Sequence, residues 1–166
     1  MYYFEVFKAL HDKKVEYLVV GGLAVNLYGV PRLTHDIDLV ISMRKENVMS
    51  LVSILTELGY EPRLPVKPAD LADPEKVKDW TENRNMKAFS FNHKKDAYKV
   101  IDIVVVHPLD FEGSFRNRTE KKVKDITINL ASIDDLIRTK EATGRAQDVS
   151  DIEMLKKAKA FLEGHP

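Results

Sequence analysis

Apolar residues recur at different periods along this chain, and each period predicts a kind of local structure. Spacings of three and four, as at Val48, Leu51, Val52 and Leu55, are typical of a helix with one buried face. Unbroken β-branched runs bounded by polar turns are typical of buried strands. The predicted helices cover residues 3–13, 23–28, 46–58, 133–143 and 149–162, and the predicted strands cover residues 16–20, 36–42, 87–92 and 98–106.

The order of these elements predicts an α+β fold, in which helices pack on a mixed sheet and the C-terminal end is helical. Residues 62–79 contain four prolines and predict a loop with at most one helical turn after Pro74. Residues 121–130 predict a short edge strand. A length of 166 residues predicts a single domain over 1–166, with a core over about 15–130 and a helical segment over about 132–163.

Composition narrows the classes of protein that fit. A hydrophobic content of 44% suits a globular core, and no run approaches the roughly 20 apolar residues that cross a membrane. The absence of cysteine excludes disulfides, thiolate zinc sites and a cysteine nucleophile. Because 26 basic residues balance 26 acidic ones, RNA binding would need a local patch such as the basic run 116–124. We expect a cytoplasmic protein with no membrane partner.

Three carboxylates stand inside apolar strands. Asp36 and Asp38 are two residues apart, so both point to one face of their strand while Ile37 points to the other. Asp102 lies in the middle of the β-branched run 99–106. Carboxylates are costly to bury unless a cation accompanies them, and Mg2+ prefers oxygen ligands. If the two strands are neighbours, the three side chains predict a site for two metal ions; the alternative is that Asp102 pairs with a Lys or Arg.

A pair of glycines precedes these carboxylates. Gly21 and Gly22 follow the strand that ends at Val20 and open a predicted helix. Glycines there let the backbone approach a ligand closely, and a helix start presents free N–H groups to an anion. On its own, such a turn is more often structural than phosphate-binding. It matches neither the P-loop nor the dinucleotide-binding fingerprint.

Taken together, these motifs resemble the nucleotidyltransferase superfamily, which has the polymerase-β-like fold. The resemblance is closer to the minimal group that contains AbiEii-type toxins and lincosamide-resistance enzymes. It spans residues of about 15–155. The wider superfamily often has Ser at the position of Gly22, so a hydroxyl that could contact phosphate is absent here. The matching pattern is Gly21-Gly22, Arg32-x-Thr34-x-Asp36-Ile37-Asp38, Asp102, Leu136-Ile137-x-x-Lys140 and Arg145-x-x-Asp148-x-x-Asp151.

The resemblance implies roles for residues whose patterns are ambiguous by themselves. It implies nucleotide contacts from Gly21, Gly22, Arg32, Thr34, Lys140, Arg145 and Asp148. Lys140 lies on the apolar stripe of its helix, so it either reaches a triphosphate or pairs with Asp148. Asp148 is alternatively a helix N-cap with Asp151 in the first turn, and Arg32 a surface ion pair.

The predicted function is metal-dependent transfer of a nucleoside monophosphate from a nucleoside triphosphate to an acceptor hydroxyl, with release of pyrophosphate. Asp36, Asp38 and Asp102 are the predicted catalytic residues and the ligands of Mg2+, or of Mn2+ in its place. The acceptor is RNA, protein or a small molecule, and an antitoxin is a candidate partner. The alternatives are a phosphohydrolase with the same carboxylates and a non-catalytic nucleotide-binding or toxin–antitoxin module.

Overall fold

The structure is a computed structural model that describes residues 2–164. A mixed sheet with helices around it confirms the predicted α+β class. The helices are α1 (Tyr2–Asp12), α2 (Gly21–Leu27), α3 (Lys45–Glu57), η1 (Pro68–Ala72, a 3-10 helix), α4 (Pro74–Asn83), α5 (Phe111–Arg116), α6 (Ile133–Thr143) and α7 (Ala146–Leu162). The strands are β1 (Tyr17–Val20), β2 (Asp36–Ile41), β3 (Tyr60–Pro62), β4 (Ala88–His93), β5 (Val100–Val104), β6 (Thr119–Val123) and β7 (Ile126–Leu130).

The seven strands form one sheet in the order β3-β4-β5-β2-β1-β7-β6. The pairs β2–β5 and β1–β7 are parallel, and the other pairs are antiparallel. The parallel pair β2–β5 brings two carboxylates together, because its register places Asp38 directly beside Asp102. The two strands are nearly 60 residues apart in the sequence, so the register that joins them cannot be derived from either strand alone.

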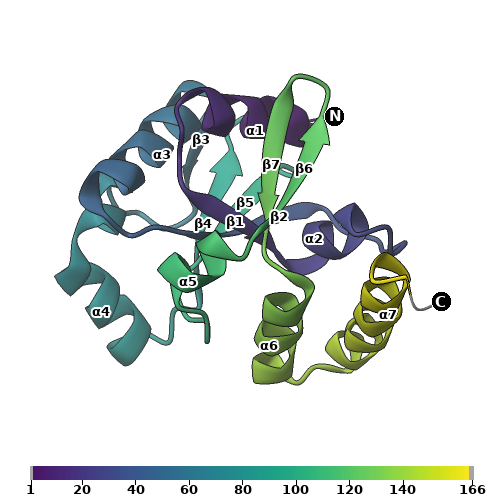
Figure 1. Cartoon of the computed structure of the whole chain (residues 1–166). Coiled ribbons are helices and arrows are strands. Elements are labelled where there is room, and N and C mark those ends of the chain that lie inside the picture. The colour runs from purple at the N-terminus through teal and green to yellow at the C-terminus, as the bar shows by residue number, and fades with distance from the viewer. Residues whose placement is uncertain (1, 165–166) are drawn as a thin grey trace.

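One face of the sheet carries the hydrophobic core. Ile37 and Leu39 of β2 and Ile101 and Ile103 of β5 alternate with the polar positions and are almost fully buried. The buried sides of α1 and α3 belong to the same core cluster. These two helices contact each other, and they lie together on one side of the sheet (Figure 1). Phe7 of α1 packs against Tyr17 of β1, with ring centroids 5.7 Å apart.

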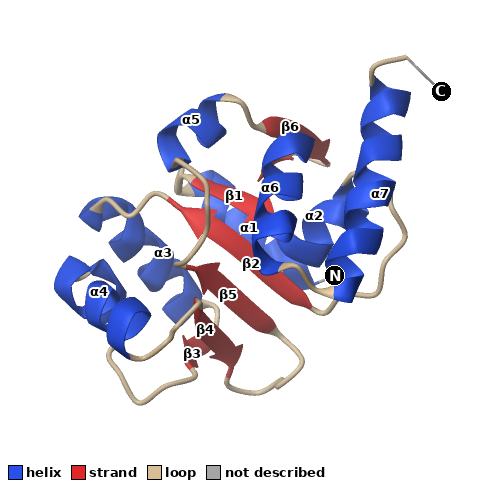
Figure 2. Cartoon of the chain, turned by 90° about the horizontal axis from the view of Figure 1, so that it is seen from below, coloured by secondary structure: helices blue, strands red, loops and turns tan. Residues whose placement is uncertain are grey.

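On the opposite face of the sheet, helices lie at the sides of the central strands. Seen from below, β4, β5 and β2 lie between α4 on one side and α6, α2 and α7 on the other (Figure 2). Asp36, Asp38 and Asp102 point to this face, which also carries Val40 of β2 and Val100 and Val104 of β5. Within residues 2–164, no helix is long and apolar enough to span a membrane.

The predicted loop over residues 62–79 is wrong. It contains η1 and the start of α4, and the short strand β3 precedes it. The side chain of Asp73 caps α4 by accepting from the backbone N–H groups of Glu75 and Lys76, and Pro74 fits the first helical turn. The prolines therefore mark helix starts here. Trp80, on the buried side of α4, packs on Phe89 with ring centroids 5.4 Å apart.

Two other elements differ from the prediction. The expected edge strand over residues 121–130 is the hairpin β6–β7, which turns at Lys124, where φ is +54°. Only β6 lies at the sheet edge, because β7 also pairs with β1. The short helix α5 was not predicted, although Asp110 caps it by accepting from the N–H of Gly113. Helix α6 has the predicted bounds. Met1, His165 and Pro166, the ends of the predicted domain 1–166, lie outside the described residues.

Candidate active site

Three carboxylates share the polar face of the sheet. Asp38 and Asp102 are register partners on neighbouring parallel strands, and Asp36 lies two residues before Asp38 on the same face. Asp36 is exposed, whereas Asp38 and Asp102 are partly buried. Asp102 therefore does not lie on the far side of the sheet. The structure brings together the three residues that were predicted to act as catalytic carboxylates.

The ionised form of Asp38 is poorly stabilised. Burial raises the pKa of Asp38 to about 7, and the neighbouring charges of Asp102 and Asp36 act in the same direction. The positive charges of Lys140 and Arg145 oppose this shift without cancelling it. Burial and the charge of Asp102 also raise the pKa of Asp36. A site in which burial and neighbouring carboxylates oppose the ionisation of Asp38 lacks positive charge, and a cation would supply it.

The Gly21-Gly22 turn lies directly against Asp38. A Cβ atom at Gly21 would overlap Oδ2 of Asp38 and approach its Cγ to 2.9 Å. The φ angle of Gly21 is +69°, a conformation that glycine adopts without strain. A Cβ atom at Gly22 would lie 2.8 Å from Oγ1 of Thr34 and 3.0 Å from Nη1 of Arg32. Both glycines are therefore required for close approach, and the turn joins Arg32 and Thr34 to the carboxylates.

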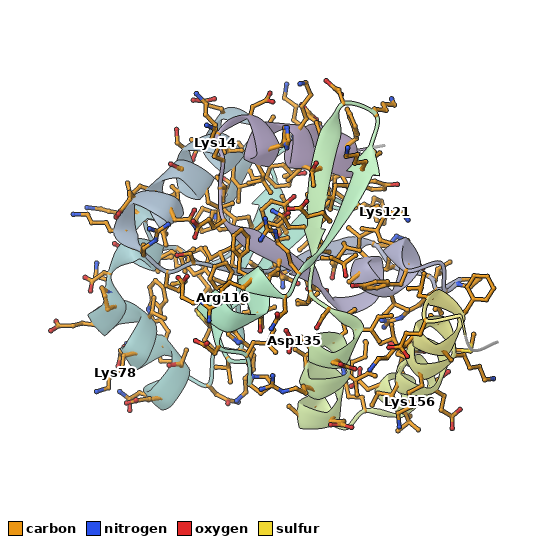
Figure 3. The ribbon with its side chains drawn as sticks, in the orientation of Figure 1. Lys14, Lys78, Arg116, Lys121, Asp135 and Lys156 are labelled. Carbon is orange, nitrogen blue, oxygen red and sulfur yellow. The ribbon has the colours of Figure 1, made fainter. Side chains whose placement is uncertain are left out.

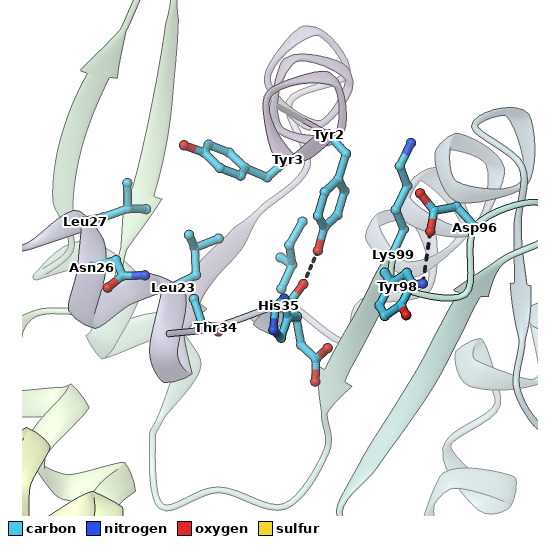
Figure 4. Close-up of a pocket in the computed structure, with 12 residues that line it drawn as sticks. Tyr2, Tyr3, Leu23, Asn26, Leu27, Thr34, His35, Asp96, Tyr98 and Lys99 are labelled. Carbon is cyan, nitrogen blue, oxygen red and sulfur yellow. Dashed lines mark hydrogen bonds between the residues drawn. The ribbon is translucent and has the colours of Figure 1, made fainter. Parts of the chain in front are cut away.

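A pocket of about 430 Å3 borders the exposed side of Asp36. Tyr2 and Tyr3 of α1, His35 and the loop residues Asp96–Lys99 surround it (Figure 4). The hydroxyl of Tyr2 donates to the backbone carbonyl of His35, next to Asp36. Burial raises the pKa of Tyr2 to about 12, and the charges of Asp36 and Asp38 contribute. Tyr2 therefore remains a neutral donor beside the carboxylates at physiological pH.

Ser90 is a site residue that the sequence reasoning missed. Its hydroxyl donates to Oδ1 of Asp102 over 2.5 Å, and the two residues are register partners on β4 and β5. This bond leaves Oδ2 of Asp102 to face other groups and fixes the orientation of the carboxylate. A signal was present in the sequence, because Ser90 stands between the buried residues Phe89 and Phe91 and so points away from the core.

The donor atoms fit a divalent cation in one respect and not in another. Among residues 2–164, no group of three or more acidic, histidine or cysteine side chains is arranged to hold a metal ion by itself. Asp38 and Asp102 nevertheless provide paired oxygen donors with too little compensating charge. Mg2+ commonly takes one or two protein carboxylates and completes its shell with substrate phosphates and water. The site therefore fits an ion that arrives with a phosphorylated ligand better than a preassembled cluster.

The start of α7 and the end of α6 form a buried ionic network. Lys140 is only 4% exposed, and its Nζ lies 2.7 Å from Oδ2 of Asp151 and 3.6 Å from Oδ1 of Asp148. Arg32 also reaches Asp151, with Nη1 2.9 Å from Oδ2. Arg32 thus connects the network to Gly22, and Lys140 acts electrostatically on Asp38. The network and the carboxylates belong to one continuous site.

One of the predicted structural alternatives is wrong, and another is confirmed with an additional partner. Asp148 is not the N-cap of α7; that position is Arg145, and Asp148 is the third residue of the helix, accepting from the backbone N–H of Arg145. The predicted ion pair of Lys140 with Asp148 is present at 3.6 Å, and Asp151 is a second and nearer partner at 2.7 Å. Burial alone would raise the pKa of Asp148, but hydrogen bonds from Arg145 and Thr143 lower it to about 2. Asp148 therefore stays ionised and anchors Arg145.

Replacing Lys140 by Met should destabilise the protein markedly. The change leaves the buried carboxylate of Asp151 with less positive charge, and breaking a buried pair in this way costs about 3 kcal/mol. The free energy of unfolding in urea measures the loss. If Lys140 also contacts phosphate, affinity for a triphosphate should fall more than affinity for the nucleoside.

The matched control for this prediction is Lys159→Met. Lys159 also joins α7 to α6, through Asp134 at 2.9 Å, but both side chains are exposed. Exposed pairs contribute little, so Lys159→Met should leave stability almost unchanged. Equal losses in the two variants would contradict the importance assigned to the buried network. Equal losses of triphosphate and nucleoside affinity at Lys140 would assign it a structural role only.

The basic run 116–124 does not form one surface. Arg116 lies on α5 and Lys121 lies on β6, well apart in the molecule (Figure 3). Arg118 stacks on Phe115, 4.0 Å from the ring centroid, and pairs with Glu120 at 2.7 Å. The Nζ of Lys121 donates to the carbonyl of Leu27 over 2.7 Å. Structural contacts therefore account for two members of the run, Arg118 and Lys121.

Comparison with protein families gives one match that covers nearly the whole chain. Residues 4–159 match the family described as "Nucleotidyltransferase of unknown function (DUF6036)". The match includes the three carboxylates, the Gly21-Gly22 turn, Ser90 and the buried ionic network, but it begins after Tyr2 and Tyr3. No curated protein sequence matches the chain.

Solved structures with the same fold include two enzymes that modify antibiotics. The lincosamide antibiotic adenylyltransferase LnuA, bound to lincomycin, superposes with a TM-score of 0.61 at 20% identity, over 94% of this chain and 95% of that one. ANT(2")-Ia in complex with adenylyl-2"-tobramycin has a TM-score of 0.56 at 12% identity, over 99% and 94%. An antigenic nucleotidyltransferase-like protein from Paracoccidioides brasiliensis has a TM-score of 0.51 at 18% identity, over 92% and 73%. These similarities confirm the predicted nucleotidyltransferase fold.

Proposed function

This chain belongs to the family Nucleotidyltransferase of unknown function (DUF6036), and from that premise we propose that it transfers a nucleoside monophosphate from a nucleoside triphosphate to an acceptor hydroxyl. The observation that carries the proposal is the placement of Asp38 beside Asp102, with Gly21 packed against the Asp38 carboxylate. Paired carboxylates next to a glycine turn suit a reaction at a phosphorus atom, in which positioning and charge neutralisation do most of the catalysis.

Asp36, Asp38 and Asp102 are the residues that would hold Mg2+, or Mn2+ in its place. When bound, the ion neutralises the charge that develops on the phosphate oxygens and compensates the carboxylates. The raised pKa of Asp38 supports this assignment, because a carboxylate that is costly to ionise gains most from a cation. The side chains of the protein supply only part of the ligand shell, and the triphosphate supplies the rest.

The other residues bind and orient the triphosphate. The Gly21-Gly22 turn allows its phosphates to approach the backbone, with Arg32 and Thr34 beside Gly22. Lys140 and Arg145 add positive charge on the same side of Asp38. Asp148 holds Arg145 through a 3.0 Å ion pair. In this arrangement the phosphates lie over the junction of β1, α2 and β2, on the side away from β4.

Asp102 is the residue that accepts the proton of the acceptor. The acceptor oxygen forms a bond to the α-phosphorus, and the bond from that phosphorus to the oxygen bridging to the β-phosphate breaks, so pyrophosphate leaves. The proton of the hydroxyl passes to Asp102, whose Oδ1 is held by Ser90, and then to solvent. The antibiotic-modifying enzymes of the same fold favour a small molecule over RNA or protein as the acceptor.

The proposal is tested by incubating the protein with Mg2+, a cell extract and each nucleoside triphosphate, labelled either at the α- or at the γ-phosphate. We expect α-label in a new product and γ-label in pyrophosphate, with neither seen for Asp38→Asn. Labelled monophosphate without a labelled acceptor would indicate a phosphohydrolase instead. Triphosphate binding without turnover in any extract would indicate a non-catalytic nucleotide-binding or toxin–antitoxin module.

A further inference from the structure

The line of polar residues that contains Asp38 and Asp102 continues across the sheet. Ser90 of β4 is the register partner of Asp102. Arg63 follows β3, and its backbone N–H donates to the carbonyl of Ser90, which continues the antiparallel pairing of β3 and β4 by one residue. Asp38, Asp102, Ser90 and Arg63 therefore form a row on one face, with neighbouring strands about 4.8 Å apart. The row leads away from the Gly21-Gly22 turn.

A pocket of about 520 Å3 lies at the far end of this row. Ser90 forms part of its wall, so the pocket borders the hydroxyl that holds Asp102. The remaining wall combines apolar groups with two guanidinium groups. The guanidinium groups belong to Arg63 and Arg84. The apolar residues are Leu64, Pro65, Val66, Trp80, Met86 and Ala88.

The direction of phosphoryl transfer assigns the pocket to one reactant. The attacking and leaving oxygens must lie roughly in line on opposite sides of the phosphorus. If pyrophosphate leaves on the side of Gly21, the acceptor hydroxyl approaches from the side of Asp102 and Ser90. An acceptor that approaches from this side would lie in the pocket, because Ser90 is itself part of the pocket wall.

We propose that this pocket binds the acceptor, and that the acceptor is a small molecule with a hydroxyl, an apolar or aromatic body and an anionic group. The inference rests on the proposed transferase function and adds the class of the second substrate. A volume of about 520 Å3 suits a compact ligand, since small-molecule sites enclose roughly 300–1,000 Å3. The apolar wall matches the body of such a ligand.

The charges in the pocket account for the anionic group. Arg84 already pairs with Asp79 at 3.0 Å. Arg63 forms no ion pair within 4 Å among residues 2–164, and its side chain hydrogen-bonds the amide oxygen of Asn92 at 3.3 Å. Its charge acts at longer range on Asp36, whose pKa it lowers against the larger effects of burial and Asp102. A free guanidinium beside an apolar wall is suited to a carboxylate or phosphate, which it can bind through two parallel hydrogen bonds. The same charge disfavours cationic acceptors.

Binding of a ligand in the pocket can be measured by tryptophan fluorescence. Trp80 is the only tryptophan of the chain and forms part of the wall, so its fluorescence should respond to a ligand there. Titration with para-(hydroxymethyl)benzoate, benzyl alcohol and para-(hydroxymethyl)benzylamine compares an anion, a neutral molecule and a cation of similar shape. We expect the anion to bind about tenfold more tightly than the neutral molecule, and the cation to bind most weakly.

Variants separate a ligand contact from a general charge effect. Arg63→Gln should lower the affinity for para-(hydroxymethyl)benzoate about tenfold and leave that for benzyl alcohol unchanged. Arg44→Gln is the matched control, because Arg44 is an exposed arginine, paired with Glu16, that forms no part of the pocket wall. Equal binding of anion and cation, or an Arg63→Gln variant that binds the anion like the wild type, would overturn the proposal.

Failure of the inference can be told apart from failure of the proposed function. Once a labelled acceptor is identified, Arg63→Gln should raise its KM at least about tenfold while the KM for the triphosphate stays within about twofold. An acceptor that is an RNA or a protein would overturn the inference and leave the transferase function standing. Anion binding at Trp80 without transfer to any acceptor would overturn the assignment of the pocket to an acceptor together with the transferase function.

Discussion

Replacing Asp38 by Asn should abolish nucleotidyl transfer and, at the same time, stabilise the metal-free protein above pH 7. The loss of transfer follows from the removal of a negative charge that a cation needs, and we expect a decrease of at least about a thousandfold. The gain in stability follows from the cost of ionising Asp38 beside Asp102 and Asp36. Opposite effects of one isosteric change on activity and stability are typical of a residue kept for function.

The pH dependence of this gain has a defined sign. Folding raises the pKa of Asp38 from 3.8 to about 7, so the native state binds more protons than the unfolded state between these values. The wild type therefore loses stability as the pH rises from about 4 to about 7, and Asp38→Asn does not. The difference between the two proteins should be small at pH 4 and reach about 2–4 kcal/mol at pH 8.

Urea unfolding in the presence of a chelator, at pH 4 and pH 8, measures this difference. Asp36→Asn is the control, because Asp36 is exposed and its ionisation should cost less. Addition of Mg2+ with a triphosphate should reverse the order and stabilise the wild type more than Asp38→Asn, since only the wild type keeps the full set of ligands. An Asp38→Asn variant that is less stable than the wild type at pH 8 would contradict the electrostatic account of the site.

Replacing Gly21 by Ala should also remove most of the activity, for a steric reason. The added Cβ would occupy the position of the Asp38 carboxylate, so either the turn or Asp38 must move. A displacement of about 1 Å at a reacting centre costs on the order of a hundredfold in rate. Transfer activity should therefore fall by at least that factor.

Gly144→Ala is the control for backbone strain. Gly144 has a φ of +62°, similar to the +69° of Gly21, but a Cβ there would meet no atom within 4 Å. Both variants carry the cost of a left-handed backbone, roughly 1–2 kcal/mol, and only Gly21→Ala adds the collision. Comparable activity in the two variants would show that the close approach of Gly21 to Asp38 has no catalytic importance.

Sequence reasoning located the carboxylates because their signal is local. A charged residue at alternate positions of an apolar strand fixes its face without any knowledge of the neighbouring strand, and this is how Asp36 and Asp38 were found. The predicted bounds of α6 are confirmed for a similar reason, since its apolar spacing is local, and so are the Ser132 cap and the left-handed Gly144 that the structure shows at its ends. The roles of these residues in catalysis stay predictions.

The remaining features depend on contacts between distant segments. The closer pairing of Lys140 with Asp151 than with Asp148 depends on the angle between α6 and α7, which no spacing in the sequence encodes. Ser90 becomes a site residue only through its register with Asp102. The resemblance placed a missing hydroxyl at Gly22, and the structure places Oγ1 of Thr34 2.8 Å from where a Cβ of that residue would lie.

The row of Asp38, Asp102, Ser90 and Arg63 makes catalytic competence a cooperative property of folding. A slip of one residue between β2 and β5 would turn Asp102 into the core and expose Ile101 and Ile103. Burial of the hydrophobic face therefore selects the register that also aligns the polar residues, because a sheet in the wrong register loses both its core and its site. A population of this protein should consist of fully competent and unfolded molecules, and destabilising conditions should lower the number of active molecules without creating weakly active ones.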